Sequence, residues 1–333
     1  MKHSKIYDVP TNIITGFLGS GKTSVILNLL QQRPAHERWA ILVNEFGEIG
    51  VDGSLMQGQL LDHEGVFIKE VPGGCMCCTA GVSMQIALNQ LLKEANPHRL
   101  LIEPTGLGHP IEILQVLSNE YNKNVLNIEK SITLVDARNL KDARYTEHDI
   151  FNQQIAIADI VVGSKSDLYT PSDKKALSDF INQKTLTPQY VGFIEHGNIS
   201  LDLLLGPSKK LTTLTACDNH HSHANTSSID DDLMLKSGFV KAINSGEGFQ
   251  SIGWRFSAKT IFDRPTLYQF LKSLNVVRVK AVFNTADGMF GYNTAGDGII
   301  ETSLNKCKES RIEIINNNID EQWEHELLKL IKS

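Results

Sequence analysis

The sequence TNIITGFLGSGKT, residues 11–23, carries the strongest structural signal in the chain. It begins as an apolar, β-branched run, becomes rich in glycine, and is followed by VILNLLQQ, which has the apolar spacing of a helix. Its second half, GFLGSGKT, matches the pattern G-x-x-x-x-G-K-[ST] in the strand–loop–helix context that the pattern requires. Backbone N–H groups of such a loop surround phosphate oxygens, and the helix N-terminus favours negative charge. The stretch predicts a binding site for a nucleoside triphosphate.

Two side chains of this loop have specific expected roles. Lys22 should reach the β- and γ-phosphates, and the hydroxyl of Thr23 should be offered to Mg²⁺. The other residues expected to line the phosphates are Gly16, Phe17, Leu18, Gly19, Ser20, Gly21 and Ser24.

Working outward, strand-like and helix-like segments alternate up to about residue 205. The strand candidates are 11–17, 39–46, 66–71, 99–104, 131–137, 159–165 and 189–195. Their nearly continuous Val, Ile and Leu content is typical of strands buried on both faces, as in a parallel sheet. Helices are expected over 80–96 and 172–184. We therefore predict a doubly wound, mostly parallel α/β domain over residues 1–205.

The alternation ends at a polar segment, residues 206–234, which reads as a linker or long surface loop that contains histidines. Beyond it, strands are expected at 249–257, 276–285 and 310–317, and helices at 264–275 and 320–331. This pattern predicts a smaller α+β domain over 235–333 with an antiparallel sheet.

Composition excludes several classes of protein. The 333 residues are 41% hydrophobic, as in globular proteins, and the formal net charge of −6 gives no footprint for nucleic acid. The N-terminus has no apolar secretory core, and no uncharged apolar run is long enough to cross a bilayer. We expect a cytoplasmic protein that binds neither nucleic acid nor membrane.

A short motif after a buried strand favours guanine as the base. In GSKSDL, Lys165 would cover the ring face, and Asp167 would accept hydrogen bonds from N1–H and the exocyclic amine. Adenine lacks that pair of donors, so the motif favours GTP. Ser164 stands where the usual N-K-x-D pattern has asparagine.

Acidic residues near the phosphates should complete a hydrolytic site. Glu103, at the end of a strand, can hold Mg²⁺ through water or position the attacking water, and Gly106 can donate its N–H to the γ-phosphate. Asp52 is the other acid expected to face the metal. No arginine is obviously placed to stabilise the transition state, so slow intrinsic turnover is expected.

Three of the five cysteines, Cys75, Cys77 and Cys78, lie in PGGCMCCTAG, residues 72–81. In a reducing compartment such a cluster more often binds metal or does redox work than forms a disulfide. Three thiolates suit Zn²⁺ in tetrahedral geometry with one position open, which favours transfer of the ion, and Co²⁺ is also accepted. A static structural zinc and a redox role are the alternatives, although the spacing is not C-x-x-C.

The motifs GFLGSGKT, NEFGE, GGCMCC, EPTG and SKSD, in that order, resemble the CobW-like family of P-loop GTPases. The later motifs WRF, FDRP, RVKA and ESRIEII resemble the C-terminal domain of that family. The resemblance implies a GTPase that carries zinc, or cobalt for cobalamin synthesis, to a client apo-metalloprotein. It also implies that Cys75, Cys77 and Cys78 are the metal ligands, with Glu45 as a nearby oxygen ligand.

Further expectations follow from this resemblance. The histidines of CDNHHSH, His220, His221 and His223, are candidates for a second, weaker metal element in the linker.

A zinc-responsive GTPase that resets a partner interaction is the alternative to a chaperone. The identity of the client and the choice between a monomer and a dimer that depends on nucleotide or metal stay open. A small-molecule kinase is disfavoured because no arginine-rich lid segment is found.

Overall fold

The computed structural model describes residues 6–43, 65–71, 80–209, 238–246, 248–294, 298–305 and 307–332. The chain divides into two compact units, one of which holds the described residues up to 209 and the other those from 238 onward. Within these described ranges, none of the helices is both long and apolar enough to cross a bilayer.

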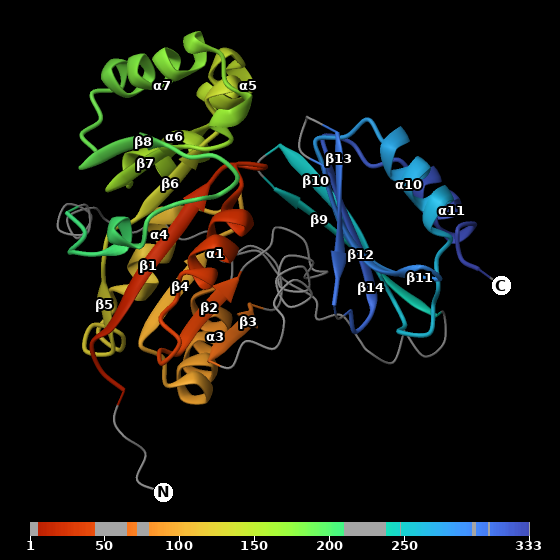
Figure 1. Cartoon of the computed structure of the whole chain (residues 1–333), viewed down its shortest axis with the longest axis horizontal. Coiled ribbons are helices and arrows are strands. Elements are labelled where there is room, and N and C mark those ends of the chain that lie inside the picture. Colours follow the sequence, from red (N-terminus) through yellow and green to blue (C-terminus); the bar gives the residue numbers. More distant parts are fainter. Residues whose placement is uncertain are drawn as a thin grey trace, which may run out of the picture. The chain divides into compact units, whose positions relative to one another are not determined.

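The first unit is built on an eight-stranded sheet with the strand order β3-β2-β4-β1-β6-β7-β8, in which β5 pairs with β1 beside β6 (Figure 1). All of its pairings are parallel. The strands are β1 (Val9–Gly16), β2 (Trp39–Val43), β3 (Val66–Glu70), β4 (Arg99–Glu103), β5 (Leu126–Ile128), β6 (Ile132–Val135), β7 (Ile160–Gly163) and β8 (Tyr190–Phe193).

Helices lie between β1 and β2, between β3 and β4, between β4 and β5, between β6 and β7 and between β7 and β8, as crossover connections of a parallel sheet. The α-helices are α1 (Lys22–Gln31), α3 (Ala80–Ala95), α4 (Pro110–Leu117), α5 (Ala143–Thr146), α6 (Asp149–Ala156) and α7 (Pro171–Gln183). Short 3₁₀ turns are η1 (Ala137–Lys141), η2 (Ser166–Leu168) and η3 (Leu201–Leu204). The strand order reverses at β1, where ligands of open parallel sheets bind.

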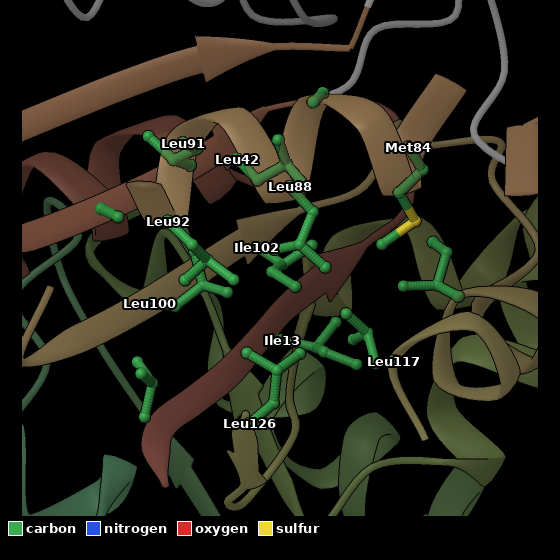
Figure 2. Close-up of a cluster of buried hydrophobic side chains, with 14 of the residues drawn as sticks. Ile13, Leu42, Met84, Leu88, Leu91, Leu92, Leu100, Ile102, Leu117 and Leu126 are labelled. Carbon is green, nitrogen blue, oxygen red and sulfur yellow. The ribbon is translucent and has the colours of Figure 1, made fainter. Parts of the chain in front are cut away.

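The core explains why the strands are apolar throughout. On one face, Ile13 of β1, Leu42 of β2 and Ile102 of β4 pack against Leu88 and other residues of α3 (Figure 2). Successive residues of a strand point to opposite faces. The neighbouring Ile14, Ile41 and Leu101 are also fully buried, so both faces of these strands are covered. Burial of such side chains stabilises the fold by about 1.5–3 kcal/mol each.

The second unit is a six-stranded antiparallel sheet with the order β13-β12-β11-β14-β10-β9. Its elements are β9 (Phe239–Gly246), β10 (Phe249–Phe256), α10 (Arg264–Ser273), β11 (Arg278–Thr285), β12 (Gly288–Thr294), β13 (Ile299–Leu304), β14 (Ser310–Asn316) and α11 (Gln322–Leu328). Trp254, Phe283 and Tyr292 from the sheet share a core with Leu267 of α10 and Leu327 of α11.

The predicted fold class is confirmed: a mostly parallel α/β domain is followed by a separate antiparallel α+β domain. The seven predicted strands of the first unit correspond to β1–β4 and β6–β8, with described ends that differ by up to two residues; residues 44–46 of the predicted second strand lie outside the described part. The sequence analysis missed β5, β9, β12 and β13. Leu126–Ile128 is too short for a periodic signal, and β12 contains two glycines, which weaken a strand pattern.

Candidate functional site

The glycine-rich loop lies at the carboxyl end of β1, between that strand and the N-terminus of α1. Gly16 has φ 146°, and an added Cβ there would come within 2.5 Å of both the Leu134 carbonyl oxygen and Ser20 Oγ. Only glycine fits this position, because the loop doubles back tightly against β6. The first residues of α1 then present the positive end of the helix dipole at the loop.

Lys22 is folded back onto the loop that precedes it. Its Nζ donates to the Gly16 carbonyl at 2.8 Å and to the Phe17 carbonyl at 3.4 Å, and the residue is 5% exposed. The ammonium group is therefore held at the concave side of the loop, where a phosphate would compete for it. The Ser20 hydroxyl is also buried, and no partner for it is found among the residues that the structure describes. A donor in this position suits a phosphate oxygen.

Thr23 and Glu103 meet at the phosphate end of the site. Thr23 Oγ1 donates to Glu103 Oε1 at 3.1 Å, and Glu103 is 1% exposed at the end of β4. A hydroxyl beside a buried carboxylate forms an all-oxygen donor set, which is what Mg²⁺ prefers. The pair would hold the ion, whose charge would neutralise phosphate oxygens when it is bound.

The turn after β4 lies directly on the loop. A Cβ added to Gly106 would come within 2.8 Å of the Leu18 backbone N and 3.0 Å of its Cα. The turn is closed by a hydrogen bond from Gly108 N to the Thr105 carbonyl at 3.0 Å. Glu103 and Gly106 thus lie against the loop, and the turn has no room for a side chain at position 106. Their predicted roles toward Mg²⁺ and the γ-phosphate stay predictions.

An aromatic cluster holds the loop from the other side. The Phe17 ring is 4% exposed and makes edge contacts with Tyr145, His148 and Phe151, at centroid distances of 5.2, 4.9 and 6.0 Å. Phe17 was expected to line the phosphates. Its side chain anchors the loop to α5 and α6, and its carbonyl accepts from Lys22, so a contact of Phe17 with phosphate would come from its backbone and stays a prediction.

The residues expected to read the base lie at the carboxyl ends of β6 and β7. Ser164 is buried, and its backbone N donates to the Val135 carbonyl at 2.9 Å. Lys165 adopts a left-handed conformation with φ 56°, and Asp167 is exposed in η2. A positive φ is uncommon for a lysine.

Asp136 is a residue at this end that the sequence analysis missed. Its carboxylate lies 3.7 Å from Lys165 Nζ and accepts from Arg138 Nε at 2.9 Å and Arg138 Nη2 at 2.7 Å. Tyr169 braces the same strand end: its hydroxyl accepts from Ala137 N at 2.7 Å and donates to the Val135 carbonyl at 3.1 Å. Burial raises the pKa of Tyr169, which keeps the phenol protonated as that donor.

A polar strand-end residue is a signal that could have found this group. Asp136 follows β6 directly, in SITLVDA, and strand ends at this edge of a parallel sheet supply ligand-binding side chains. Arg138 lies in η1 and is held by Asp136, so it is positioned near Lys165.

Several expected site residues lie outside the described part of the chain. They are Glu45, Asp52, Cys75, Cys77, Cys78, His220, His221 and His223. Among the residues that are described, no group of three or more His, Cys, Asp or Glu side chains is arranged to hold a metal ion. The described chain does fix what flanks the cysteines: Val71, just beyond β3, donates its N–H to the Val43 carbonyl at 3.0 Å, and α3 begins at Ala80.

Comparison with known proteins places this site in a family. Residues 10–189 match the model of the CobW/HypB/UreG nucleotide-binding domain. Zinc chaperone YeiR of Escherichia coli (strain K12) is 40% identical over 326 residues, which cover 96% of this chain and 97% of that protein. Zinc chaperone CobW of Sinorhizobium sp is 28% identical over 223 residues, covering 60% and 62% respectively.

A search of solved structures gives the zinc-bound YjiA GTPase from Escherichia coli, with 18% identity, a TM-score of 0.42, and coverage of 98% of this chain and all of that one.

The predicted resemblance is confirmed by these sequence comparisons. The family model covers more than half of the chain and contains the whole phosphate end of the site, and the match to YeiR extends over nearly the entire length of both proteins. The predicted class, a P-loop GTPase, is confirmed at this level. The chain belongs to the CobW/HypB/UreG family.

Proposed function

We propose that this protein is a GTP-hydrolysing zinc chaperone that binds Zn²⁺ through Cys75, Cys77 and Cys78 and transfers it to a client apo-metalloprotein. Two similar proteins, one of them 40% identical over nearly the full length, are named zinc chaperones. The thiolates suit zinc as a cargo because three of them leave one tetrahedral position open for a ligand of the client.

The observation that carries the nucleotide half of this proposal is the packing of the Gly106 turn on the loop. The backbones of Gly106 and Leu18 approach too closely for any side chain, while Thr23 is hydrogen-bonded to Glu103. Groups on β1, α1 and β4 therefore converge where the terminal phosphate of a nucleotide would lie. Such preorganised donors and carboxylates perform most of the catalysis in phosphoryl transfer.

The roles of these residues follow from their contacts. Lys22 exchanges the carbonyls of Gly16 and Phe17 for phosphate oxygens when the nucleotide binds. Thr23 and Glu103 hold Mg²⁺, and Glu103 orients the attacking water. Gly106 donates its N–H to the γ-phosphate, which is the group that distinguishes GTP from GDP.

At the base end, Lys165 lies over the guanine ring and Asp167 accepts from its N1–H and amine. The support for this assignment is the position of both residues just beyond β7 and the fixed orientation of Lys165 beside Asp136. Ser164 replaces the usual asparagine, and its buried hydroxyl has no partner among the described residues, so it is available to the ribose or base.

The metal motif is proposed to respond to the nucleotide because of where the chain enters and leaves it. The motif lies between Val71 and Ala80, directly beyond β3. Val43 of β2 is the register partner of both Glu70 and Glu103, so the chain leaves for the cysteines from the same sheet edge that carries Glu103. A rearrangement around the γ-phosphate at this edge would change the hold on zinc.

The test measures zinc stoichiometry and GTP hydrolysis on the reduced full-length protein. Wild type should bind one zinc tightly and hydrolyse GTP slowly, and simultaneous change of Cys75, Cys77 and Cys78 to Ser should abolish tight zinc binding. The matched control is Cys307→Ser, a thiol in the second unit, which should leave zinc binding unchanged. Unaltered zinc affinity in the triple variant would refute the ligand assignment, and absence of GTP hydrolysis in wild type would refute the enzyme.

A further inference from the structure

Gln154 is a residue of α6 that has no assigned role. Its side chain is 0% exposed, and its Nε2 donates to the Gly106 carbonyl at 3.1 Å. Its own backbone carbonyl accepts from Thr133 Oγ1 on β6 at 2.7 Å, so the helix is fastened to the sheet at the same residue. The amide therefore connects a fixed element to the turn that faces the proposed γ-phosphate site.

The surroundings confine the Gly106 turn from two directions. The backbone of Leu18 lies on one side, at the distance that excludes a Cβ, and the Gln154 amide holds the carbonyl of the turn. The segment that carries Gln154 also carries His148 and Phe151, whose rings contact Phe17. The loop and the turn are thus both positioned by one short stretch of chain, α5–α6.

The oxygen of this amide, Gln154 Oε1, is buried and lacks a hydrogen-bond donor among the described residues. A buried polar atom without a partner costs about 1–3 kcal/mol, and buried groups normally find one. The Gly106 turn should rearrange around a phosphate. The unpartnered Gln154 Oε1 beside it therefore indicates that another arrangement of the turn supplies the donor.

We propose that Gln154 is a positioning residue for the Gly106 turn, which is the proposed γ-phosphate-binding turn. The Gln154 amide donor holds the turn in the described arrangement. When GTP is bound, both the donor and the oxygen of the Gln154 side chain contact the turn. Gln154 touches neither nucleotide nor metal and acts through Gly106. The inference rests on the proposed nucleotide chemistry, but it is independent of zinc and of the client.

The test compares the affinity of the Mg²⁺-bound full-length protein for fluorescent GDP and for a fluorescent non-hydrolysable GTP analogue. Gln154→Met keeps the side-chain length but removes both hydrogen-bonding groups. Affinity for the GTP analogue should fall about tenfold, which corresponds to a loss of about 1.4 kcal/mol of binding free energy. Affinity for GDP should stay within twofold of wild type. In turnover, kcat should fall while KM for GTP changes less.

Two further variants make the test decisive. Gln153→Met changes the neighbouring, half-buried glutamine of the same helix and should leave both affinities unchanged. Gln154→Asn keeps a buried amide but withdraws it by one methylene, and it should show the same selective loss even if the methionine variant fails to fold.

Equal losses for both nucleotides, or no loss for either, would show that Gln154 only fills the core, and would overturn the inference while leaving the proposed function intact. Failure of wild type to bind either nucleotide would overturn both.

Discussion

At the phosphate end of the proposed site, Lys22 and Glu103 are almost completely buried and take part in hydrogen bonds of 2.8 Å and 3.1 Å, respectively. At the base end, Asp167 is exposed, and Lys165 is held by an ion pair with Asp136 at 3.7 Å. The comparison indicates that side chains are buried and fixed most firmly at the end where GTP hydrolysis is proposed to occur. At the end proposed to select the base, the contacts are longer and more accessible to water, which weakens each of them.

The largest effect should come from the buried lysine. Lys22→Ala removes the buried ammonium group that contacts the loop carbonyls, and kcat/KM for GTP should fall by roughly 10²–10³, the usual cost of losing a preorganised donor. The control is Lys175→Ala, an exposed lysine of α7, which should have no effect. Steady-state GTP hydrolysis measures both. A loss below tenfold would show that the phosphate end does not depend on Lys22.

The close approach of turn and loop should give the next largest effect. In Gly106→Ala the new Cβ meets the Leu18 backbone at 2.8 Å, so loop or turn must shift, and kcat/KM should fall by about 10- to 100-fold, corresponding to the 1–3 kcal/mol of overpacking.

Gly108→Ala is the matched control for this packing. Its Cβ would meet Thr105 Cγ2, the end of a side chain, at 2.9 Å, and the loss should be several times smaller. Equal activity in the two variants would contradict the role given to the Gly106–Leu18 contact.

At the base end, a single acid should decide selectivity with a smaller effect. Asp167→Ala should lower the preference for GTP over ATP by about tenfold. This is the lower end of the free-energy range for a hydrogen bond to a charged group, and the lower end applies because Asp167 is exposed. Competition between the two nucleotides in a binding assay measures this ratio, with Asp179→Ala on α7 as the exposed control. An unchanged ratio would remove Asp167 from the guanine site.

The smallest effect should come from the support of Lys165. Asp136→Asn weakens the ion pairs with Arg138 and Lys165, and affinity for GTP should fall about threefold because partly exposed pairs contribute about 1 kcal/mol or less. Asp142→Asn is a close match, since Asp142 and Arg144 repeat the same Asp-x-Arg contact on the surface. A larger loss in the Asp142 variant would place the support elsewhere.

The contrast between the two ends also separates what the sequence could predict from what it could not. The roles of Lys22 and Thr23 follow from a local pattern of eight residues, and Glu103 and Gly106 from their place after a buried strand. The structure brings Thr23 and Glu103 into hydrogen-bond contact, while their roles toward Mg²⁺ and phosphate stay predictions.

Two other contacts between segments distant in the chain could not be predicted. The helical spacing places Gln154 on the buried face of α6 with Ile150 and Phe151. No local pattern, however, specifies its partner Gly106, which lies 48 positions away in the chain. Likewise, the position of Phe17 in the motif did not specify the direction of its ring, which depends on its packing against α5 and α6. Sequence spacing specifies backbone geometry, but packing partners are decided by the tertiary fold.

The most direct test of the account is a linkage measurement between nucleotide and zinc. Zinc affinity of the reduced, Mg²⁺-containing protein would be measured against a chromophoric chelator, once with GDP and once with a non-hydrolysable GTP analogue. We predict a difference of tenfold or more, about 1.4 kcal/mol of coupling, that disappears when Cys75, Cys77 and Cys78 are changed to Ser. Zinc must shift the affinity for the GTP analogue by the same factor. Identical zinc affinities in the two nucleotide states would contradict the chaperone mechanism.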